Sequence, residues 1–437
     1  MDDFAEQIVT SALGFGAKDA VGRVVVDRNY QIRVSQNQPA IANEWRKTSG
    51  QAFLNYDGRI VSGEVSDLAQ ISETVGRLVK IAKGSQPNPE FVGLAKGPFR
   101  YRRLSSDPKV VKLMDGSDYV EAAIHGAIEE GAKETAGSFW RYHEEHYLYT
   151  SNGASGNDVN VGLYLSIRAH AGPESSGHGV ACATRKAAFE PERAGHKAGR
   201  IAALAKDPKP GTPGAYDVVF DPLIFGSLID QLGGRSSAYS VAAGFSPLGG
   251  KLGKKVASSA VTLYDDATAD TLGRLRFDEE GVPVRRKAIV QDGVLKTYLH
   301  NTSTAKKYKT KTTANAGLVA PSAHALVLEG GDWTRDELFQ DVRDGLWLTN
   351  TWYTRYQSYV TGDFSTIPRD GIFRIKDGEI AGVWKDIRIT DNLLGVWKRV
   401  KGLSKKAEQV QWWGEVGVPT VAPYALVTKV NVTRSAM

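Results

Sequence analysis

Apolar and polar residues alternate with two different periods in the first half of the chain. Helical spacing of apolar residues predicts helices at residues 2–14, 66–83, 118–131 and 191–205. Strict alternation predicts strands at 21–27, 30–35, 44–56, 59–64, 137–150, 158–171 and 177–186. We expect the first two strands to form a hairpin that turns at Asp27-Arg28-Asn29, and the next two to turn at Asp57-Gly58. Short turns join most of the strands, so this half is predicted to be helices packed on antiparallel strands.

A segment rich in proline and glycine, Lys206–Gly214, separates the two halves of the chain. Proline cannot donate to a strand ladder or continue a helix, and glycine weakens both, so this composition indicates a linker. We therefore predict an N-terminal α+β domain at residues 1–207 and a C-terminal β-rich domain at 208–437.

The second half alternates between short strands and turn signals. A helix is expected from Asp221-Pro222 to about Leu232, and shorter helices at 303–308, 334–342 and 392–400. The repetition of short strands favours a closed or nearly closed sheet. The predicted fold class is α+β, with a barrel-like C-terminal domain that carries short helices.

The aromatic residues are densest between Gly345 and Ile380. Asp377-Gly378 predicts a hairpin turn between strands at 371–375 and 379–384. The preceding stretch mixes aromatic rings with an arginine, which suits an extended peptide and its carboxylate groups. The candidate peptide-binding residues are Trp352, Tyr353, Arg355 and Tyr356. An aromatic layer of the core is the alternative interpretation of the same stretch.

Composition and charge narrow the class of protein. The 437 residues are 41% hydrophobic and 24% charged, as in globular proteins. The single cysteine, Cys182, excludes a disulfide framework and a cysteine-rich zinc site, and it fits a reducing cytoplasm. No signal peptide or membrane-spanning run is recognisable, so we expect a cytoplasmic protein. The net charge of +6 is dispersed, which makes nucleic-acid binding the less favoured alternative.

Local catalytic and metal motifs are missing from the sequence. It contains no HExxH, HExxxH or CxxC, and no Gly-x-Ser-x-Gly elbow. His143-Glu-Glu-His146 falls in a predicted strand, where the two histidines point to opposite faces and cannot share a metal. We interpret them as alternating surface residues.

Three segments resemble the TldD/PmbA family, also known as modulators of DNA gyrase. They are RFDEEGVPVRRKAIVQDGVLKTYLHNTSTAKK (Arg276–Lys307), TGDFSTIPRDGIFRIKDGEI (Thr361–Ile380) and ITDNLLGVWKRV (Ile389–Val400). A weaker match at YLYTSNGASG (Tyr147–Gly156) extends the resemblance into the first half. It implies a metallopeptidase family with two subunit types. TldD-like chains carry HExxxH on the helix that opens the second domain and a later cysteine ligand, whereas TldE/PmbA-like chains lack the metal site.

The resemblance places Ile229 and Gly234 at the two histidine positions and Asp230 at the general-base position. Trp413, in QWWGEVGVP, falls at the cysteine position. Isoleucine, glycine and tryptophan side chains cannot bind zinc. The resemblance therefore implies a TldE/PmbA-type subunit with no catalytic residue and no metal of its own.

Three hypotheses about function follow. In the first, the chain pairs with a TldD-like subunit that supplies zinc, and completes a cytosolic chamber for unfolded peptides. In the second, suggested by the family's gyrase label and the basic charge, it is a regulatory protein acting on nucleic acid or a topoisomerase. In the third, it is an enzyme with its own chemistry at Asp230, Asp363 or the dispersed histidines.

Overall fold

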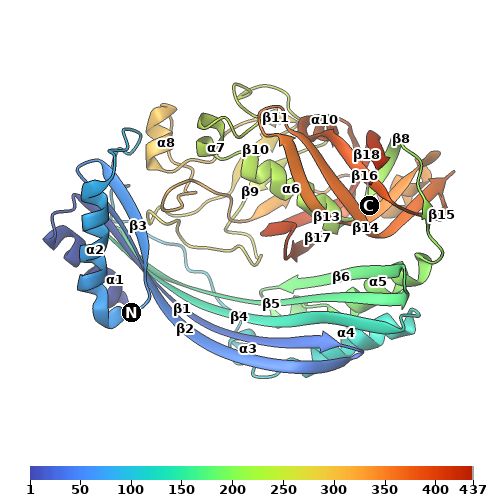
Figure 1. Ribbon diagram of the computed structural model, residues 1–437, viewed down its shortest axis with the longest axis horizontal. Helices are drawn as coiled ribbons and strands as arrows, with labels where there is room; N and C mark the ends of the chain where they lie inside the picture. The colour runs from blue at the N-terminus through green and yellow to red at the C-terminus, as the bar shows by residue number, and fades with distance from the viewer. Residues whose placement is uncertain (436–437) are drawn as a thin grey trace.

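Two β-sheets organise residues 1–435, the part of the chain that the computed structural model describes (Figure 1). The first sheet has six strands in the order β3-β2-β1-β4-β5-β6, and every neighbouring pair is antiparallel. Its strands are β1 (Asp19–Ser35), β2 (Gln38–Tyr56), β3 (Arg59–Val65), β4 (Glu134–Thr150), β5 (Ser155–Gly172) and β6 (Ser175–Ala183). In Figure 1 this sheet curves beneath the C-terminal half of the molecule.

Helices cover the convex face of the curved sheet. The pair α1 and α2 covers one end, and α4 and α5 cover the other. The helices of this half are α1 (Asp2–Gly14), η1 (Leu68–Gln70), α2 (Ile71–Gly84), α3 (Pro108–Val111), α4 (Ser117–Glu129), η2 (Lys186–Ala188) and α5 (Pro191–Leu204). The antiparallel sheet with helices on one face confirms the fold class predicted for this half.

The second sheet is mixed and has twelve strands. Its strands are β7 (Lys209–Pro210), β8 (Gly214–Phe220), β9 (Leu263–Asp265), β10 (Lys287–Gln291), β11 (Val294–Leu295), β12 (Leu326–Leu328), β13 (Asp344–Ser358), β14 (Asp363–Lys376), β15 (Glu379–Lys385), β16 (Ile387–Asn392), β17 (Val400–Trp412) and β18 (Val416–Arg434). Because β16 pairs with both β14 and β18, the strands β8, β13, β14, β16 and β18 close into a ring. This ring is the barrel-like feature predicted from the repetition of short strands.

Short helices accompany the second sheet, as expected. They are α6 (Pro222–Arg235), α7 (Ala238–Ala242), α8 (Thr302–Lys307), α9 (Arg335–Gln340) and α10 (Leu393–Lys398). The helix α6 is buried along most of its length and packs against β18, β13 and β17. No helix within residues 1–435 is long and apolar enough to cross a membrane.

The predicted hairpin at Asp27-Arg28-Asn29 is wrong, because β1 runs through these residues without a turn. The strand lies between β2 and β4, and Asp27 has a register partner on each of them, Lys47 and Glu144. Pairing on both sides supplies the backbone hydrogen bonds, and this tertiary context overrides the local preference of polar residues for turns. The hairpin turns predicted at Asp57-Gly58 and Asp377-Gly378 are confirmed, and all four residues have positive φ angles.

One part of the predicted linker also forms a strand. Lys209 and Pro210 pair in parallel with Trp384 and Lys385, so this segment joins the edge of the second sheet. Proline is compatible with an edge strand because the missing N–H need not face a neighbour.

An ion cluster ties α5 of the first half to the second half. The Lys197 ammonium lies 2.8 Å from Asp221 Oδ1 and 3.3 Å from Glu408 Oε2. Asp221 is fully buried and caps α6, where its carboxylate accepts the Leu223 N–H. Burial disfavours the ammonium, but attraction to the two carboxylates outweighs it and raises the pKa of Lys197.

We expect Lys197→Met to lower the free energy of unfolding by about 3–5 kcal/mol, because it leaves the buried Asp221 carboxylate without a counter-charge. Arg193→Ala is the matched control, since Arg193 contacts the same Glu408 from a mostly exposed position and should cost about 1 kcal/mol or less. Urea unfolding curves measure both. Equal costs for the two variants would contradict the role of the buried pair.

Candidate functional site

A cavity of about 1000 Å³ lies between the concave face of the first sheet and the β17–β18 region of the second. In Figure 1, β17 lies above β5 and β6, and the cavity is bounded by these elements. We call it the chamber. Its floor is built by β1, β4, β5 and β6, and its ceiling by β13, β14 and the turn between β17 and β18.

Alternation along the strands decides which side chains reach the floor. On β5, Leu163, Leu165 and Ile167 are buried in the core that α4 and α5 cover. The residues between them point to the other face, where Tyr164, Ser166 and Arg168 line the chamber. On β4, the same alternation places Ser138, Trp140 and Tyr142 on the floor.

Three tryptophans form the ceiling. The Trp352 ring lies 5.4 Å from the Trp412 ring in an edge-on arrangement and 6.0 Å from the Trp413 ring. The guanidinium of Arg369 lies 5.7 Å from the centre of the Trp352 ring. Trp413 is 82% exposed, so its ring is available to a bound molecule.

A bulge in β13 sets the position of Trp352. The register with β14 shifts between Trp352 and Arg355, and Tyr353 has a left-handed backbone with φ of 65°. This conformation is unfavourable for a bulky residue and persists where its surroundings enforce it. The buried Glu415 does so, because its carboxylate accepts hydrogen bonds from the N–H groups of Tyr353 and Thr354 and from the Thr354 hydroxyl.

A buried histidine connects the floor to the ceiling. The Trp412 indole N–H donates to His178 Nε2 at 3.0 Å, and Asn350 Nδ2 lies 3.1 Å from His178 Nδ1. Burial lowers the pKa of His178 to about 3, so this imidazole is neutral at physiological pH. Its hydrogen bonds link the first sheet to the second across the chamber.

A hydrogen bond joins α6, which carries the positions aligned with the metal motif, to β18. The Asp230 carboxylate, on α6, accepts the backbone N–H of Gly417 at 3.1 Å, and Gly417 lines the chamber near the β17–β18 turn. Ile229 is fully buried in the core, Gly234 offers no side chain, and Trp413 extends into the chamber.

None of Ile229, Gly234 and Trp413 has a donor atom suited to zinc, so the residues present do not fit the metal that the family resemblance aligns there. Within residues 1–435, no group of three or more histidine, cysteine, aspartate or glutamate side chains is arranged to hold a metal ion.

Asp230 remains the one acidic group at the motif. Burial raises its pKa to about 6, and the N–H groups of Gly417 and Val418 oppose part of that rise. A carboxylate with this pKa could act as a base near neutral pH. In this structure the Asp230 carboxylate accepts backbone hydrogen bonds from β18. These contacts anchor β18 to α6 next to the ceiling of the chamber.

The other groups considered for independent chemistry have structural contacts. Asp363 accepts from Asn392 Nδ2 at 2.9 Å and from the Thr361 hydroxyl, and these bonds lower its pKa. His143 and His146 point to opposite faces of β4, as predicted, but both are buried rather than on the surface. Their partners explain the burial, since His146 contacts Arg23 and Glu144, and His143 lies 3.8 Å from Glu145.

The four candidate peptide-binding residues occupy different environments. Trp352 lines the chamber. Tyr353 and Arg355 are exposed and stack on each other, with the guanidinium 4.0 Å from the ring centre, outside the chamber lining. Tyr356 is packed between Tyr359, Phe364 and the Arg235 guanidinium.

Sequence reasoning missed the chamber floor. The aromatic residues Trp140, Tyr142 and Tyr164 and the arginines Arg33 and Arg168 were all visible in predicted strands. The available signal was the alternation itself, which puts Trp140 and Tyr142 on the face opposite the buried Phe139.

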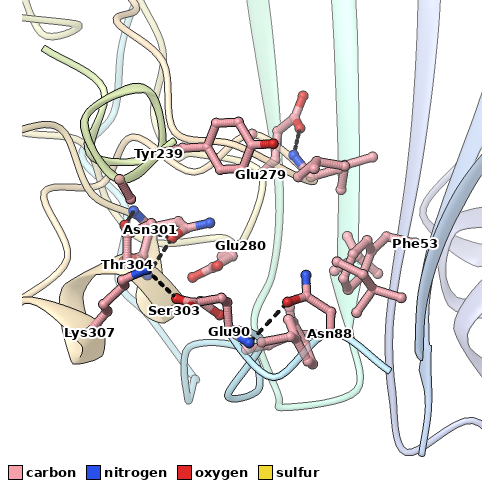
Figure 2. Close-up of a pocket in the computed structure, with 18 of the residues that line it drawn as sticks. Phe53, Asn88, Glu90, Tyr239, Glu279, Glu280, Asn301, Ser303, Thr304 and Lys307 are labelled. Carbon is pink, nitrogen blue, oxygen red and sulfur yellow. Dashed lines mark hydrogen bonds and ion pairs between the residues drawn. The ribbon is translucent and has the colours of Figure 1, made fainter. Parts of the chain in front are cut away.

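A second cavity of about 380 Å³ lies beside α7 and α8. Figure 2 shows Phe53 and Asn88 on one wall and Ser303 and Lys307 on the other, with Glu280 between them. Its charged lining residues are Glu90, Glu279, Glu280 and Lys307. Burial and, secondarily, the nearby Asp278 raise the pKa of Glu280 to about 8. This cavity is therefore acidic in composition, unlike the chamber.

Comparisons with known proteins agree with this geometry. The profile of the PmbA/TldA metallopeptidase C-terminal domain matches residues 213–434. A metalloprotease of Methanothermobacter thermautotrophicus is 30% identical over 321 residues, which are 69% of this chain and 69% of that protein. TldE from Thermococcus kodakarensis is similar in fold, with a TM-score of 0.85 at 20% identity over 98% of this chain and 100% of that one. A Thermotoga maritima structure, described as a candidate modulator of a DNA gyrase, has a TM-score of 0.85 at 22% identity over 99% of both chains.

We expect Asp230→Asn to stabilise the protein at pH 8 and to have no effect near pH 4. The folded pKa of about 6 lies above the reference value of 3.8, so the cost of burying the ionised carboxylate grows between pH 3.8 and about 6 and is fully present above that pH. The difference of about two pKa units corresponds to an increase of at most ~3 kcal/mol in the free energy of unfolding of the variant at pH 8. Urea unfolding between pH 4 and 8 measures it.

Asp363→Asn is the control for this experiment. Hydrogen bonds hold the pKa of Asp363 below its usual value, so its replacement should destabilise the protein at neutral pH, with the opposite sign. A stabilisation by Asp230→Asn that is equal at pH 4 and pH 8 would contradict the burial of an ionisable group.

Proposed function

Because the chain belongs to the PmbA/TldD metallopeptidase family, we propose that it is the TldE/PmbA-type subunit of a two-chain peptidase. In this proposal, a TldD-like partner carries the zinc ion and cleaves the peptide bond. This chain holds unfolded peptide substrate in its chamber and has no catalytic residue of its own. The single cysteine suits assembly in the cytosol.

One observation supports the proposal: Ile229 and Gly234, which the family resemblance aligns with the two histidines, carry no zinc donor. The Asp230–Gly417 hydrogen bond joins α6 to β18, which lines the chamber. A chamber large enough for a peptide persists beside a centre that cannot bind zinc. Such an arrangement supports binding without cleavage in this subunit.

Trp413 has a defined role in this proposal. Its ring, at the position aligned with a cysteine ligand, extends the aromatic ceiling that Trp352 begins. A tryptophan ring provides a large, rigid contact surface for an extended peptide, and its side chain loses little conformational entropy on binding. Tyr353 and Arg355 form an exposed pair that would contact peptide only outside the chamber, and Tyr356 would act by supporting this segment.

We expect the purified chain to co-elute with an HExxxH-bearing relative in size-exclusion chromatography and to raise its cleavage of an unstructured fluorogenic peptide. The complex should lose cleavage when the HExxxH glutamate of the relative is replaced by glutamine. Metal analysis of this chain alone should find no stoichiometric zinc, because the aligned positions lack donors. Failure to co-elute together with no gain in cleavage would refute the proposal.

We expect Trp413→Ala to raise the KM of the complex several-fold and leave kcat nearly unchanged, because the ring binds ground state and transition state alike. Its exposure means that the fold should not suffer. Phe15→Ala is the control, since Phe15 is an exposed aromatic residue at the end of α1 and away from the chamber lining. Steady-state kinetics with a peptide series measures both, and an unchanged KM in Trp413→Ala would remove this residue from the site.

A further inference from the structure

The charged residues that line the chamber are all arginines. Three arginines, Arg33, Arg168 and Arg369, contribute to its lining, and no aspartate or glutamate does. Within residues 1–435, neither Arg33 nor Arg369 has a carboxylate within ion-pair distance. Two guanidinium groups are therefore available to an anion that enters from outside.

Arg168 is held in place by a buried carboxylate. Its Nη2 lies 3.4 Å from Asp370 Oδ2, and Asp370 in turn accepts hydrogen bonds from Asn350 Nδ2 at 2.7 Å and Ser176 Oγ at 2.8 Å. Burial opposes ionisation of Asp370, but Arg168 and the hydrogen bonds hold its pKa below the usual value. A guanidinium group has several N–H donors, so Arg168 keeps donors for a second carboxylate while it is paired with Asp370.

The register of the sheet leaves a trough between Arg33 and Arg168. Arg33 is opposite Ser138 on β4, and Arg168 is opposite Ala136, two residues farther along the same strand. Strand spacings of about 4.8 Å and a rise of about 3.4 Å per residue put the two arginine backbones roughly 12 Å apart. Only small side chains lie between them, so both guanidinium groups can reach a ligand above Ala136 and Ser138.

We propose that these arginines form a carboxylate-binding site, so that the chamber selects peptides carrying a carboxylate. The inference rests on the proposed function, because it names the chemical class of the peptide. The carboxylate can come from the C-terminus of the peptide or from an aspartate or glutamate side chain. Trp140, Trp352 and Trp413 provide apolar surface for the neighbouring side chains of the same peptide.

Single-stranded nucleic acid is the other anion that stacks on aromatic rings beside arginines. Binding along a nucleic-acid backbone requires a groove that follows several phosphates. Here the cations are gathered in one bounded cavity, with Arg33 and Arg168 on either side of the small residues Ala136 and Ser138. This charge distribution favours a ligand with a localised carboxylate over a polyanion.

Fluorescence anisotropy with the full-length isolated chain tests the site directly. The probes are octapeptides of one apolar sequence, labelled with an uncharged fluorophore that has no carboxylate, in four forms: free C-terminus, amidated C-terminus, amidated with one internal aspartate, and amidated with asparagine at that position. We expect the amidated asparagine peptide to bind about 10-fold more weakly than a peptide that keeps one carboxylate. Comparison of the free C-terminal and internal aspartate forms identifies the source of the carboxylate.

Variants assign the effect to the arginines. Arg369→Gln and Arg33→Gln should each weaken the carboxylate-bearing peptide about 5- to 10-fold and leave the amidated asparagine peptide unchanged. Arg168→Lys keeps the charge beside Asp370 while losing the planar fork, so it should reduce the same preference without unfolding the protein. Arg46→Gln is the matched control, because Arg46 is an exposed arginine on the opposite face of the same sheet.

The outcomes separate this inference from the proposed function. Equal affinities for all four peptides, or an equal effect of Arg46→Gln, would overturn the carboxylate site even if the complex cleaves peptide. Displacement of the aspartate peptide by a short oligothymidine at equal charge concentration would also overturn it in favour of nucleic acid. A carboxylate preference that depends on Arg369 supports the site, whether or not a zinc-bearing partner assembles with the chain.

Discussion

Alternation of side chains along the strands of the first sheet is the constraint on which the chamber depends. A shift of one residue in β5 would exchange Leu165 and Ile167, which the helices cover, with Ser166 and Arg168, which face the chamber. The apolar core under α4 and α5 therefore fixes the register that presents the polar and aromatic floor. Binding groups carried by long paired strands are positioned more rigidly than groups on loops.

Polar groups with defined hydrogen bonds hold the ceiling of the chamber in place. Asp230 anchors β18 through Gly417, Glu415 anchors the bulge that presents Trp352, and His178 joins Trp412 to the floor. Glu415 and His178 are buried and Asp230 is partly buried, so each would carry a desolvation cost without its partners. Hydrogen bonds between these strands and α6 therefore define the geometry of the ceiling.

Sequence patterns predicted the elements with strong local signals and missed what depends on tertiary pairing. The turns at Asp57-Gly58 and Asp377-Gly378 were predictable because glycine and aspartate adopt positive φ there. The continuity of β1 through Arg28 was not, since two neighbouring strands override the local turn preference. The density of aromatic residues indicated a site at residues 352–356. The floor instead combines isolated rings from separate strands, and only the register of the sheet brings these rings together.

The overall charge of +6 conveys little about ligands, because charge is sorted along individual strand faces. On β4, the residues facing inward are uncharged at Ser138, Trp140 and Tyr142, and become titratable at Glu144 and His146. Two of the arginines on this concave face, Arg33 and Arg168, line the chamber, whereas Arg23 is paired with Glu279 farther along β1. Because Arg33 has no carboxylate partner among residues 1–435, its charge is available to a ligand, while the charge of Arg23 is neutralised within the fold. A peptide bound as proposed would place its carboxylate over Arg33 and Arg168.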